Sequence, residues 1–243
     1  MEQKLYCITS HTALVPNVYK LTLEGNMATE IRPGQFVNIK IEGLYLRRPI
    51  SICDADGDRI TLIYKVVGSG TTRLSRMAPG EWLDILVPLG NGFSLDEAGE
   101  RPLLIGGGVG IPPMFLLCRR LSETGRHPQV ILGFNSADDA FYEDEFLRLG
   151  ADVAVTTVDG SYGVHGYVTS AMPETDYSYV YACGPEPMLR AVYDASKTSG
   201  QFSFEERMGC GFGACMGCSC KTKYGYKRIC RDGPVLTKEE IVW

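Results

Sequence analysis

Positions 103 to 113 read Leu-Leu-Ile-Gly-Gly-Gly-Val-Gly-Ile-Pro-Pro and mark a change in the character of the chain. An apolar run enters a group of glycines and then a helix-like stretch, which predicts a strand, a tight turn and a helix. Free N–H groups in such a turn, together with the positive end of the helix, attract phosphate groups. Gly107, Gly108 and Gly110 are therefore candidate nucleotide contacts. The pattern departs from G-x-G-x-x-G, and glycine-rich turns are also common as purely structural elements.

After this segment, apolar runs alternate with helix-like stretches as far as about residue 200. This alternation is typical of a doubly wound α/β domain with a parallel sheet, which we assign to residues 100–200. A second motif, Cys183-Gly184-Pro185, follows the last expected strand. Because the carboxyl ends of parallel strands line one crevice, the two motifs should meet there. The expected strands are 103–105, 130–134, 151–155 and 177–181, and the expected helices include 113–121 and 143–149.

Residues 1–99 show a different pattern, with short strands separated by turn residues. In 35–41 and 59–67, apolar side chains recur at every second position, which buries one face of a sheet. These features predict a small antiparallel β-barrel. Turns are expected at Pro33-Gly34, Asp56-Gly57, Pro79-Gly80 and Asn91-Gly92.

The segment Arg47-Arg48-Pro49-Ile50-Ser51 in this barrel has the chemistry to bind a flavin nucleotide. An Arg side chain can neutralise a pyrophosphate through two parallel hydrogen bonds, and a Ser hydroxyl can bond a flavin ring nitrogen. Tyr64-Lys65 and Gly70-Thr71 add aromatic, cationic and backbone donors. Each of these segments is common in surface hairpins, so only their order along the chain indicates a flavin site.

Five of the nine cysteines lie between positions 210 and 230. The spacing C-x4-C-x2-C-x11-C is formed by Cys210, Cys215, Cys218 and Cys230. It matches the plant-type arrangement of ligands for a [2Fe–2S] cluster. Glycines at 209, 211 and 213 suit a loop that directs backbone N–H groups toward sulfur. A structural zinc site is the alternative, although its four cysteines usually come as two close pairs.

Residues 201–243 are too short to carry a core of their own, and we expect a metal to stabilise them. Cys220 is a surplus thiol, which we interpret as a non-ligand. The cations near the cysteines either raise the potential of an anionic cluster and form a docking surface, or simply face solvent. They are Arg207, Lys221, Lys227, Arg228 and Arg231.

Composition excludes several classes of partner. The net charge of -5 provides no overall basic field for nucleic acid. The apolar stretch 102–118 contains four glycines and three prolines, which argues against a membrane span. The first ten residues lack the pattern of a signal peptide, and clustered cysteines indicate metal ligation rather than disulfides. We therefore expect a cytoplasmic protein.

The order of the motifs resembles the ferredoxin–NADP reductase superfamily over about the first 200 residues. The cysteine-rich tail, which closes with Cys230-Arg-Asp-Gly-Pro-Val235, is similar to that of the electron-transfer subunits of class 1B dihydroorotate dehydrogenases. This resemblance implies an FAD-binding barrel (1–99), an NAD-binding α/β domain (100–200) and a [2Fe–2S] module (201–243). The motifs concerned are Arg48-Pro-Ile-Ser51, Gly70-Thr71, Pro88-Leu-Gly90, the glycine segment 106–113 and Cys183-Gly-Pro185.

Carried over to matching positions, the resemblance assigns FAD contacts to Arg48, Pro49, Ile50, Ser51, Ile63, Tyr64, Lys65, Gly70 and Thr71. Ile50 stands where the wider superfamily often has an aromatic residue, so aliphatic contact would replace ring stacking. The resemblance assigns the cluster to the same four cysteines, although the interval before Cys230 is short. Cys183 either lies beside the nicotinamide, with Gly184 next to it, or is a small buried hydrophobe.

The segment 133–143 favours NAD over NADP, because it contains no Arg or Lys to pair with a 2′-phosphate. Asp138 or Asp139 would accept a hydrogen bond from a ribose hydroxyl instead. Alternatively, these carboxylates only cap the following helix.

The resemblance further implies that an FMN-containing catalytic subunit oxidises dihydroorotate in pyrimidine biosynthesis, with two catalytic and two electron-transfer subunits in the complex. Electrons would then pass through the cluster and FAD to NAD, and no catalytic acid or base is expected in this chain. Two other hypotheses stay open. One is a flavin and iron–sulfur subunit of a cytoplasmic hydrogenase or of an NADH-dependent ferredoxin:NADP oxidoreductase. The other, of a different class, is a zinc-stabilised nucleotide-binding module.

Overall fold

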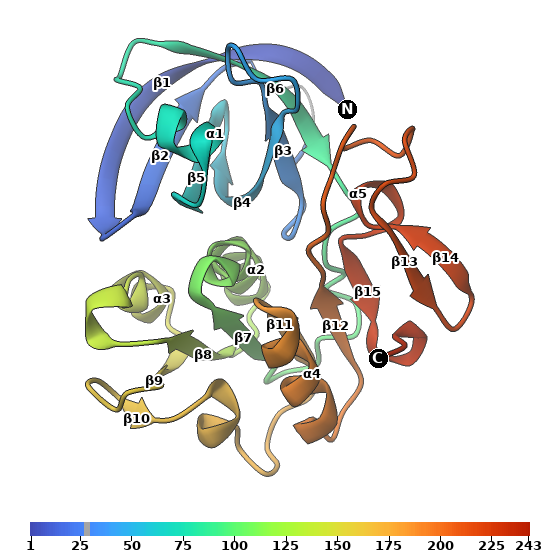
Figure 1. Ribbon diagram of the computed structural model, residues 1–243. Helices are drawn as coiled ribbons and strands as arrows, with labels where there is room; N and C mark the ends of the chain where they lie inside the picture. The colour runs from blue at the N-terminus through green and yellow to red at the C-terminus, as the bar shows by residue number, and fades with distance from the viewer. Residues whose placement is uncertain (27–29) are drawn as a thin grey trace.

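The computed structural model describes residues 1–26 and 30–243 and contains three parts (Figure 1). A β-barrel lies above an α/β sheet, and a small module from the end of the chain lies beside both. Within the described residues, none of the helices has the length and apolar character needed to cross a bilayer.

The barrel is closed and antiparallel, in the strand order β1-β2-β5-β4-β3-β6. Alternating side chains fill its interior, and Ile39, Leu62 and Ile85 are fully buried there. The predicted small antiparallel barrel is confirmed. Its strands are β1 (Glu2–Val15), β2 (Val18–Glu24), β3 (Phe36–Ile39), β4 (Arg48–Asp56), β5 (Arg59–Lys65) and β6 (Trp82–Leu89), and the short helix α1 (Ser69–Leu74) follows β5.

The α/β sheet has the order β10-β9-β8-β7-β11-β12-β15, and all its pairings are parallel except that of β15 with β12. β11 begins at Val180 rather than at residue 177. The preceding Tyr177 is buried, and its hydroxyl accepts the Lys197 backbone N–H. The strands are β7 (Leu103–Gly107), β8 (Gln129–Phe134), β9 (Asp152–Thr157), β10 (Val164–His165), β11 (Val180–Cys183), β12 (Gly200–Ser203) and β15 (Val235–Thr237).

Helices cover both faces of this sheet, as the doubly wound interpretation predicted. α2 and α3 pack on the face toward the barrel, and α4 packs on the other face with η3 (Figure 1). The bounds are η1 (Gly108–Gly110), α2 (Ile111–Glu123), η2 (Ala137–Asp139), α3 (Glu143–Arg148), η3 (Val168–Ala171) and α4 (Glu186–Ala195).

α2 connects the sheet to the barrel. Its residues Met114 and Leu117 belong to the same buried cluster as Cys53 and Ile63 of the barrel. Arg119 adds an ion pair to Asp54 at 2.8 Å and donates to the Ala55 carbonyl at 2.6 Å. Apolar burial and a partly buried ion pair therefore fix the two layers against each other.

The C-terminal module has no separate core. Cys218 and Ile229 are buried in the same cluster as Phe202 and Leu236 of the sheet. β12 spans the expected boundary at residue 200, and β15 returns to the sheet after the module's hairpin. The module consists of β13 (Ser219–Thr222), β14 (Gly225–Arg228), α5 (Ile229–Asp232), β15 and η4 (Lys238–Glu240).

Asn91 attaches this module to the end of the barrel. Its side-chain amide donates to the Asp232 and Val235 carbonyls, both at 3.1 Å, and its Oδ1 accepts from the Val235 N–H at 3.3 Å. Gly90 beside it has φ +80°, and a Cβ there would lie 2.6 Å from Pro234 Cδ. Glycine at this position therefore lets the two segments approach closely.

Gly90→Ala should loosen the module, whereas Gly57→Ala, at φ +55° with open space around it, should impose backbone strain alone. That strain amounts to about 1–2 kcal/mol. The clash with Pro234 adds roughly 1–3 kcal/mol of overpacking, so Gly90→Ala should lose more free energy of unfolding in urea. Equal losses in the two variants would contradict the close approach.

Candidate functional site

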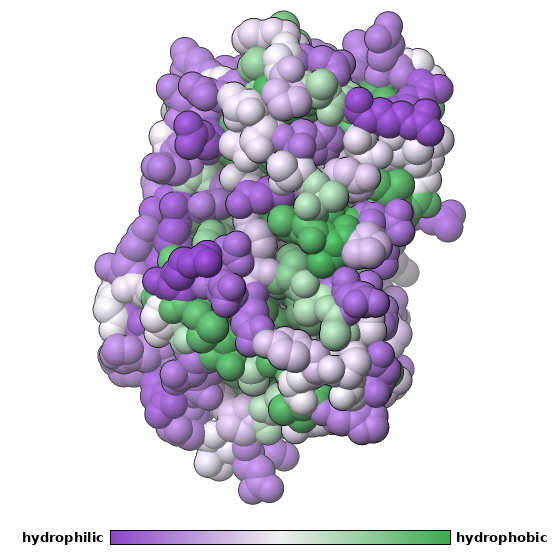
Figure 2. Space-filling view, turned by 90° about the vertical axis from the view of Figure 1, so that its left-hand side faces the viewer, coloured by the Kyte–Doolittle hydropathy of each residue, from purple (hydrophilic) through white to green (hydrophobic). Residues whose placement is uncertain are grey.

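A cavity of about 710 Å³ lies between the barrel and the carboxyl ends of the parallel strands (Figure 2). Val18 and Lys65 line it from the barrel side. Its volume is in the range of small-molecule and cofactor sites, and its position is the one that open α/β sheets use for ligands. From the sheet side it is lined by Gly107, Gly108, Gly110, Phe134, Asp139, Gly184 and Glu205, among others.

The two glycine-containing motifs meet at this cavity, as their positions after parallel strands predicted. Gly108 adopts φ +52°, and a Cβ on Gly110 would lie 2.3 Å from the Cys183 carbonyl oxygen. Glycine at 108 permits the positive φ, and glycine at 110 lets the turn pack against the Cys183 carbonyl. The structure therefore places Gly107, Gly108, Gly110 and Gly184 where a nucleotide can contact them.

The Cys183 side chain, in contrast, is buried, with 3% of its surface exposed. Burial and then the nearby Glu205 carboxylate raise the pKa of Cys183 to about 12. The thiol is therefore neutral near pH 7 and packs as a small apolar group.

Two acidic residues differ in their relation to the cavity. Asp139, at the end of η2, lines it, whereas its neighbour Asp138 is not among the described lining residues. Glu205 also lines the cavity, just beyond the end of β12. The sequence reasoning missed Glu205 because it assigned no strand to 200–203.

The segment expected to bind flavin lies on β4 and faces α1. A Cβ on Gly70 would lie 2.3 Å from Arg48 Nε, so glycine there lets the guanidinium lie across the start of α1. The Thr71 hydroxyl accepts from the Val67 N–H at 2.9 Å and donates to the Gly68 carbonyl at 3.1 Å. Thr71 therefore shapes the turn next to Arg48.

The expected contacts on β5 point to opposite sides of the strand. Tyr64 is 2% exposed inside the barrel, its ring stacks on Tyr19 at 5.9 Å, and its hydroxyl lies 2.9 Å from His11 Nε2. Its side chain is therefore not available to a flavin. Lys65 instead reaches the cavity, and Ile63 packs between the barrel and α2.

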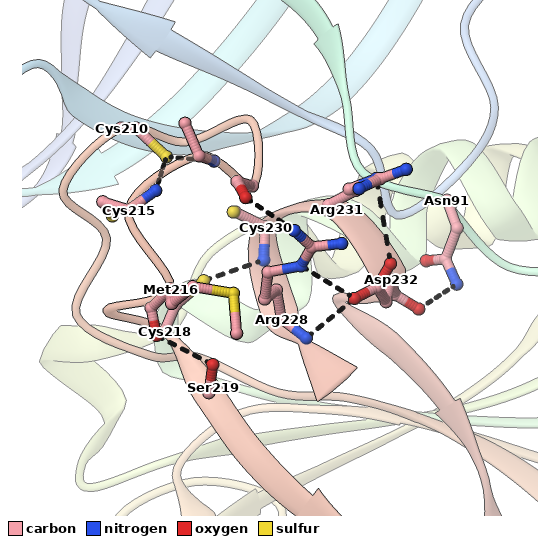
Figure 3. Close-up of polar contacts among 12 residues, drawn as sticks. Asn91, Cys210, Cys215, Met216, Cys218, Ser219, Arg228, Cys230, Arg231 and Asp232 are labelled. Atoms are coloured by element: carbon pink, nitrogen blue, oxygen red, sulfur yellow. Dashed lines mark hydrogen bonds and ion pairs between the residues drawn. The ribbon is translucent and has the colours of Figure 1, made fainter. Parts of the chain in front are cut away.

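The cysteine loop brings the four expected ligands together in two pairs (Figure 3). The backbone N–H of Cys215 donates to the sulfur of Cys210, and the backbone N–H of Cys230 donates to the sulfur of Cys218. Positive φ values of +81° at Gly211 and +91° at Gly213 let the loop turn around the sulfurs. A [2Fe–2S] cluster takes four thiolates shared between two irons, so the donor set and its pairing fit such a cluster.

Backbone N–H groups favour the thiolate form in the first pair. Cys210 Sγ accepts from the Ala214 N–H at 3.2 Å and from the Cys215 N–H at 3.5 Å. Burial alone would raise the pKa of Cys210, but these donors and the Phe212 N–H lower it to about 6. In the second pair, the Cys230 N–H donates to Cys218 Sγ at 3.4 Å. Burial, followed by Cys218, raises the pKa of the Cys230 thiol.

The expected cations of the module differ in their surroundings. Lys227 pairs with the buried Glu240, and Arg228 bonds Asp232 at 3.2 Å and the Gly213 carbonyl at 2.7 Å (Figure 3). Arg228 therefore holds the cysteine loop, which spacing alone did not reveal. Arg231 is largely exposed.

Among residues 1–26 and 30–243, no three His, Cys, Asp or Glu side chains converge on a single point that would hold one metal ion.

Three features define the class of protein: an arginine across a glycine turn of the barrel, a nucleotide crevice and paired cysteine sulfurs. Together they define a nicotinamide-linked flavin and iron–sulfur electron-transfer protein. Comparison with known proteins identifies the family. Residues 205–242 match the iron–sulfur cluster binding domain of dihydroorotate dehydrogenase B, and residues 104–194 match the oxidoreductase NAD-binding domain. The chain belongs to the family of dihydroorotate dehydrogenase B (NAD(+)) electron transfer subunits, which confirms the resemblance of its motifs.

Two relatives of that name are similar over almost their whole length. The one from Geobacillus sp. (strain WCH70) is 43% identical and covers 100% of this chain and 99% of its own. The one from Shouchella clausii (strain KSM-K16) is 44% identical, and the match covers 97% of this chain and 96% of the relative. The solved structure of an NADH-dependent reduced ferredoxin-NADP oxidoreductase superposes with a TM-score of 0.90 at 30% identity, covering 99% of this chain and 90% of that one.

Arg48→Ala should weaken FAD binding, because the Arg48 guanidinium lies across the Gly70 turn that we expect to hold the flavin. Loss of a charge-assisted hydrogen bond costs about 1.5–3 kcal/mol, which corresponds to roughly a tenfold or larger rise in Kd. Flavin content after dialysis measures the effect, with Arg76→Ala, an exposed arginine beyond α1, as the control. Equal flavin retention in both variants would contradict the assignment.

Proposed function

We propose that this chain carries electrons from an FMN-containing, dihydroorotate-oxidising subunit to NAD, in the cytoplasm and within pyrimidine biosynthesis. The observation that carries the proposal is the grouping of Cys210 with Cys215 and of Cys218 with Cys230 beside a flavin-type barrel and a nucleotide crevice. When bound, the flavin exchanges hydride with the nicotinamide and single electrons with the cluster. The chain's own residues bind these groups and set their distance and orientation.

Each region has its own task in this proposal. Residues 1–99 hold FAD, residues 100–200 bind NAD, and residues 201–243 hold the cluster. Arg48 neutralises the pyrophosphate and Ser51 bonds the flavin ring. The FAD set is completed by Pro49, Ile50, Ile63, the backbone of Tyr64, Lys65, Gly70 and Thr71. The NAD set is Gly107, Gly108, Gly110 and Gly184, with Cys183 as buried support, and the cluster ligands are Cys210, Cys215, Cys218 and Cys230.

A partner subunit follows from the family, since an electron transfer subunit serves a catalytic one. We propose a complex of two catalytic and two electron-transfer subunits. The exposed positions of Cys215 and Arg231 beside the cysteine loop support delivery of single electrons across a subunit interface. This chain needs no acid or base for hydride transfer.

A second candidate function comes from the similarity to the NADH-dependent reduced ferredoxin-NADP oxidoreductase. In that case the same cofactor sites would serve a different partner. An assay with dihydroorotate as the electron donor separates the two, because only the first partner oxidises it.

Cys215→Ser should abolish dihydroorotate-dependent NAD reduction by the complex with the FMN subunit, because one of four cluster ligands is lost. NADH-dependent reduction of a flavin-directed dye should stay within about twofold of the unmodified protein, since that path does not use the cluster. Cys220→Ser, on the neighbouring strand β13, is the matched control and should keep both activities. A complex of the unmodified subunits that fails to reduce NAD with dihydroorotate would overturn the proposed function.

Asp139→Ala should raise KM for NADH, because the variant loses a carboxylate that would accept a hydrogen bond from a ribose hydroxyl of the nucleotide. Loss of such a bond corresponds to roughly a tenfold effect. Dye-reduction kinetics with NADH and with NADPH measure the rise in KM for NADH and the smaller preference for NADH over NADPH. Asp138→Ala serves as the control, and an equal effect in the two variants would show that the carboxylates only cap the helix.

A further inference from the structure

Asn38 is a buried polar residue that the functions above leave unused. It lies on β3 with 1% of its surface exposed. In the β3–β4 pairing, Asn38 lies opposite Pro49 and Phe36 lies opposite Ser51. Asn38 is therefore built into the strand pair that carries the proposed flavin segment.

The other end of this side chain reaches the cysteine loop. Asn38 Nδ2 donates to the Cys210 carbonyl oxygen at 3.3 Å. Gly211 has φ +81°, and a Cβ there would lie 2.3 Å from Asn38 Nδ2, so glycine permits the approach. In Figure 1, β3 lies with β6 on the side of the barrel toward the module. One amide thus links the flavin strand pair to the backbone of a proposed cluster ligand.

Only one of the two polar atoms of this amide is paired. Its Oδ1 is buried and has no hydrogen-bond partner among the residues that the structure describes. An unpaired buried acceptor costs free energy, which offsets the gain from the Nδ2 bond. A small apolar side chain would fit the strand without that cost.

We propose that Asn38 is a positioning residue for electron transfer, which fixes the cluster loop at Cys210 against the flavin-binding strands β3 and β4. The inference rests on the proposed assignments of Cys210 to the cluster and of Arg48 to Ser51 to the flavin. Its physical basis is that the Asn38 side chain connects two proposed redox sites that belong to different parts of the fold. Removing the amide leaves the Cys210 carbonyl without this donor, and the loop then relaxes away from β3.

Asn38→Ala tests the proposal, with Asn91→Ala as the matched control. Both asparagines donate side-chain bonds to backbone carbonyls of the C-terminal module, but only Asn38 contacts a proposed cluster ligand. The FAD- and cluster-loaded proteins are purified without oxygen. Three properties are measured: the melting temperature, the electron paramagnetic resonance spectrum of the reduced cluster, and the rate at which NADH reduces the cluster in stopped flow.

Asn38→Ala should keep its melting temperature, shift the resonance spectrum and slow cluster reduction by about tenfold or more, since small misplacements of reacting groups have large effects on rate. Asn91→Ala should lower the melting temperature and leave the spectrum and the rate unchanged. Asn38→Asp keeps the size but loses the donor, so its spectrum and reduction rate should change as in Asn38→Ala, while the buried carboxylate lowers its melting temperature. A third variant, Cys210→Ser, should lose the cluster signal.

The outcomes test the positioning role of Asn38 separately from the assignment of Cys210 to the cluster. If Asn38→Ala has the spectrum and reduction rate of the unmodified protein while Cys210→Ser loses the signal, Asn38 has no positioning role. If Asn38→Ala instead melts at a lower temperature with an unchanged spectrum, its role is structural only. If Cys210→Ser retains the signal, the ligand assignment itself is wrong.

Discussion

The position of the cluster module depends on the pairing of β15 with β12. Gln201 lies opposite Thr237 and Ser203 lies opposite Val235, so both ends of the intervening segment are fixed on the edge of the sheet. Asn91 adds a second attachment, from the end of the barrel to the same return strand. The strand pairing brings the cysteine loop to the side of the barrel where β3 lies. The module needs this support because its buried residues Cys218 and Ile229 belong to the core of the sheet.

The same constraint places the three proposed binding sites beside one another. β12 leads directly to Glu205, which lines the nucleotide cavity, and the chain then enters the cysteine loop at Cys210. The barrel contributes Lys65 to the cavity and Asn38 to the loop. In electron transfer the cofactors perform the redox steps and the protein sets their distances. This shared packing is how the fold sets them.

Much of this architecture follows from the sequence. The alternation around Leu62 and the strand–turn–helix order at 103–113 predict the barrel and the parallel sheet, because both are local patterns. The cysteine spacing predicts the ligand set for the same reason. The roles of Asn38, Arg228 and Glu205 did not follow, because each depends on contacts between distant segments. Nor did periodicity show that Tyr64 points into the barrel while Lys65 faces the cavity, since alternation gives no sign of which face is inside.

Metal analysis of the protein shows whether Cys210, Cys215, Cys218 and Cys230 together hold a [2Fe–2S] cluster. Iron and acid-labile sulfide are quantified in protein purified without oxygen, together with zinc. About two irons and about two sulfides per chain are expected. One zinc per chain, with neither iron nor sulfide, would contradict the cluster assignment.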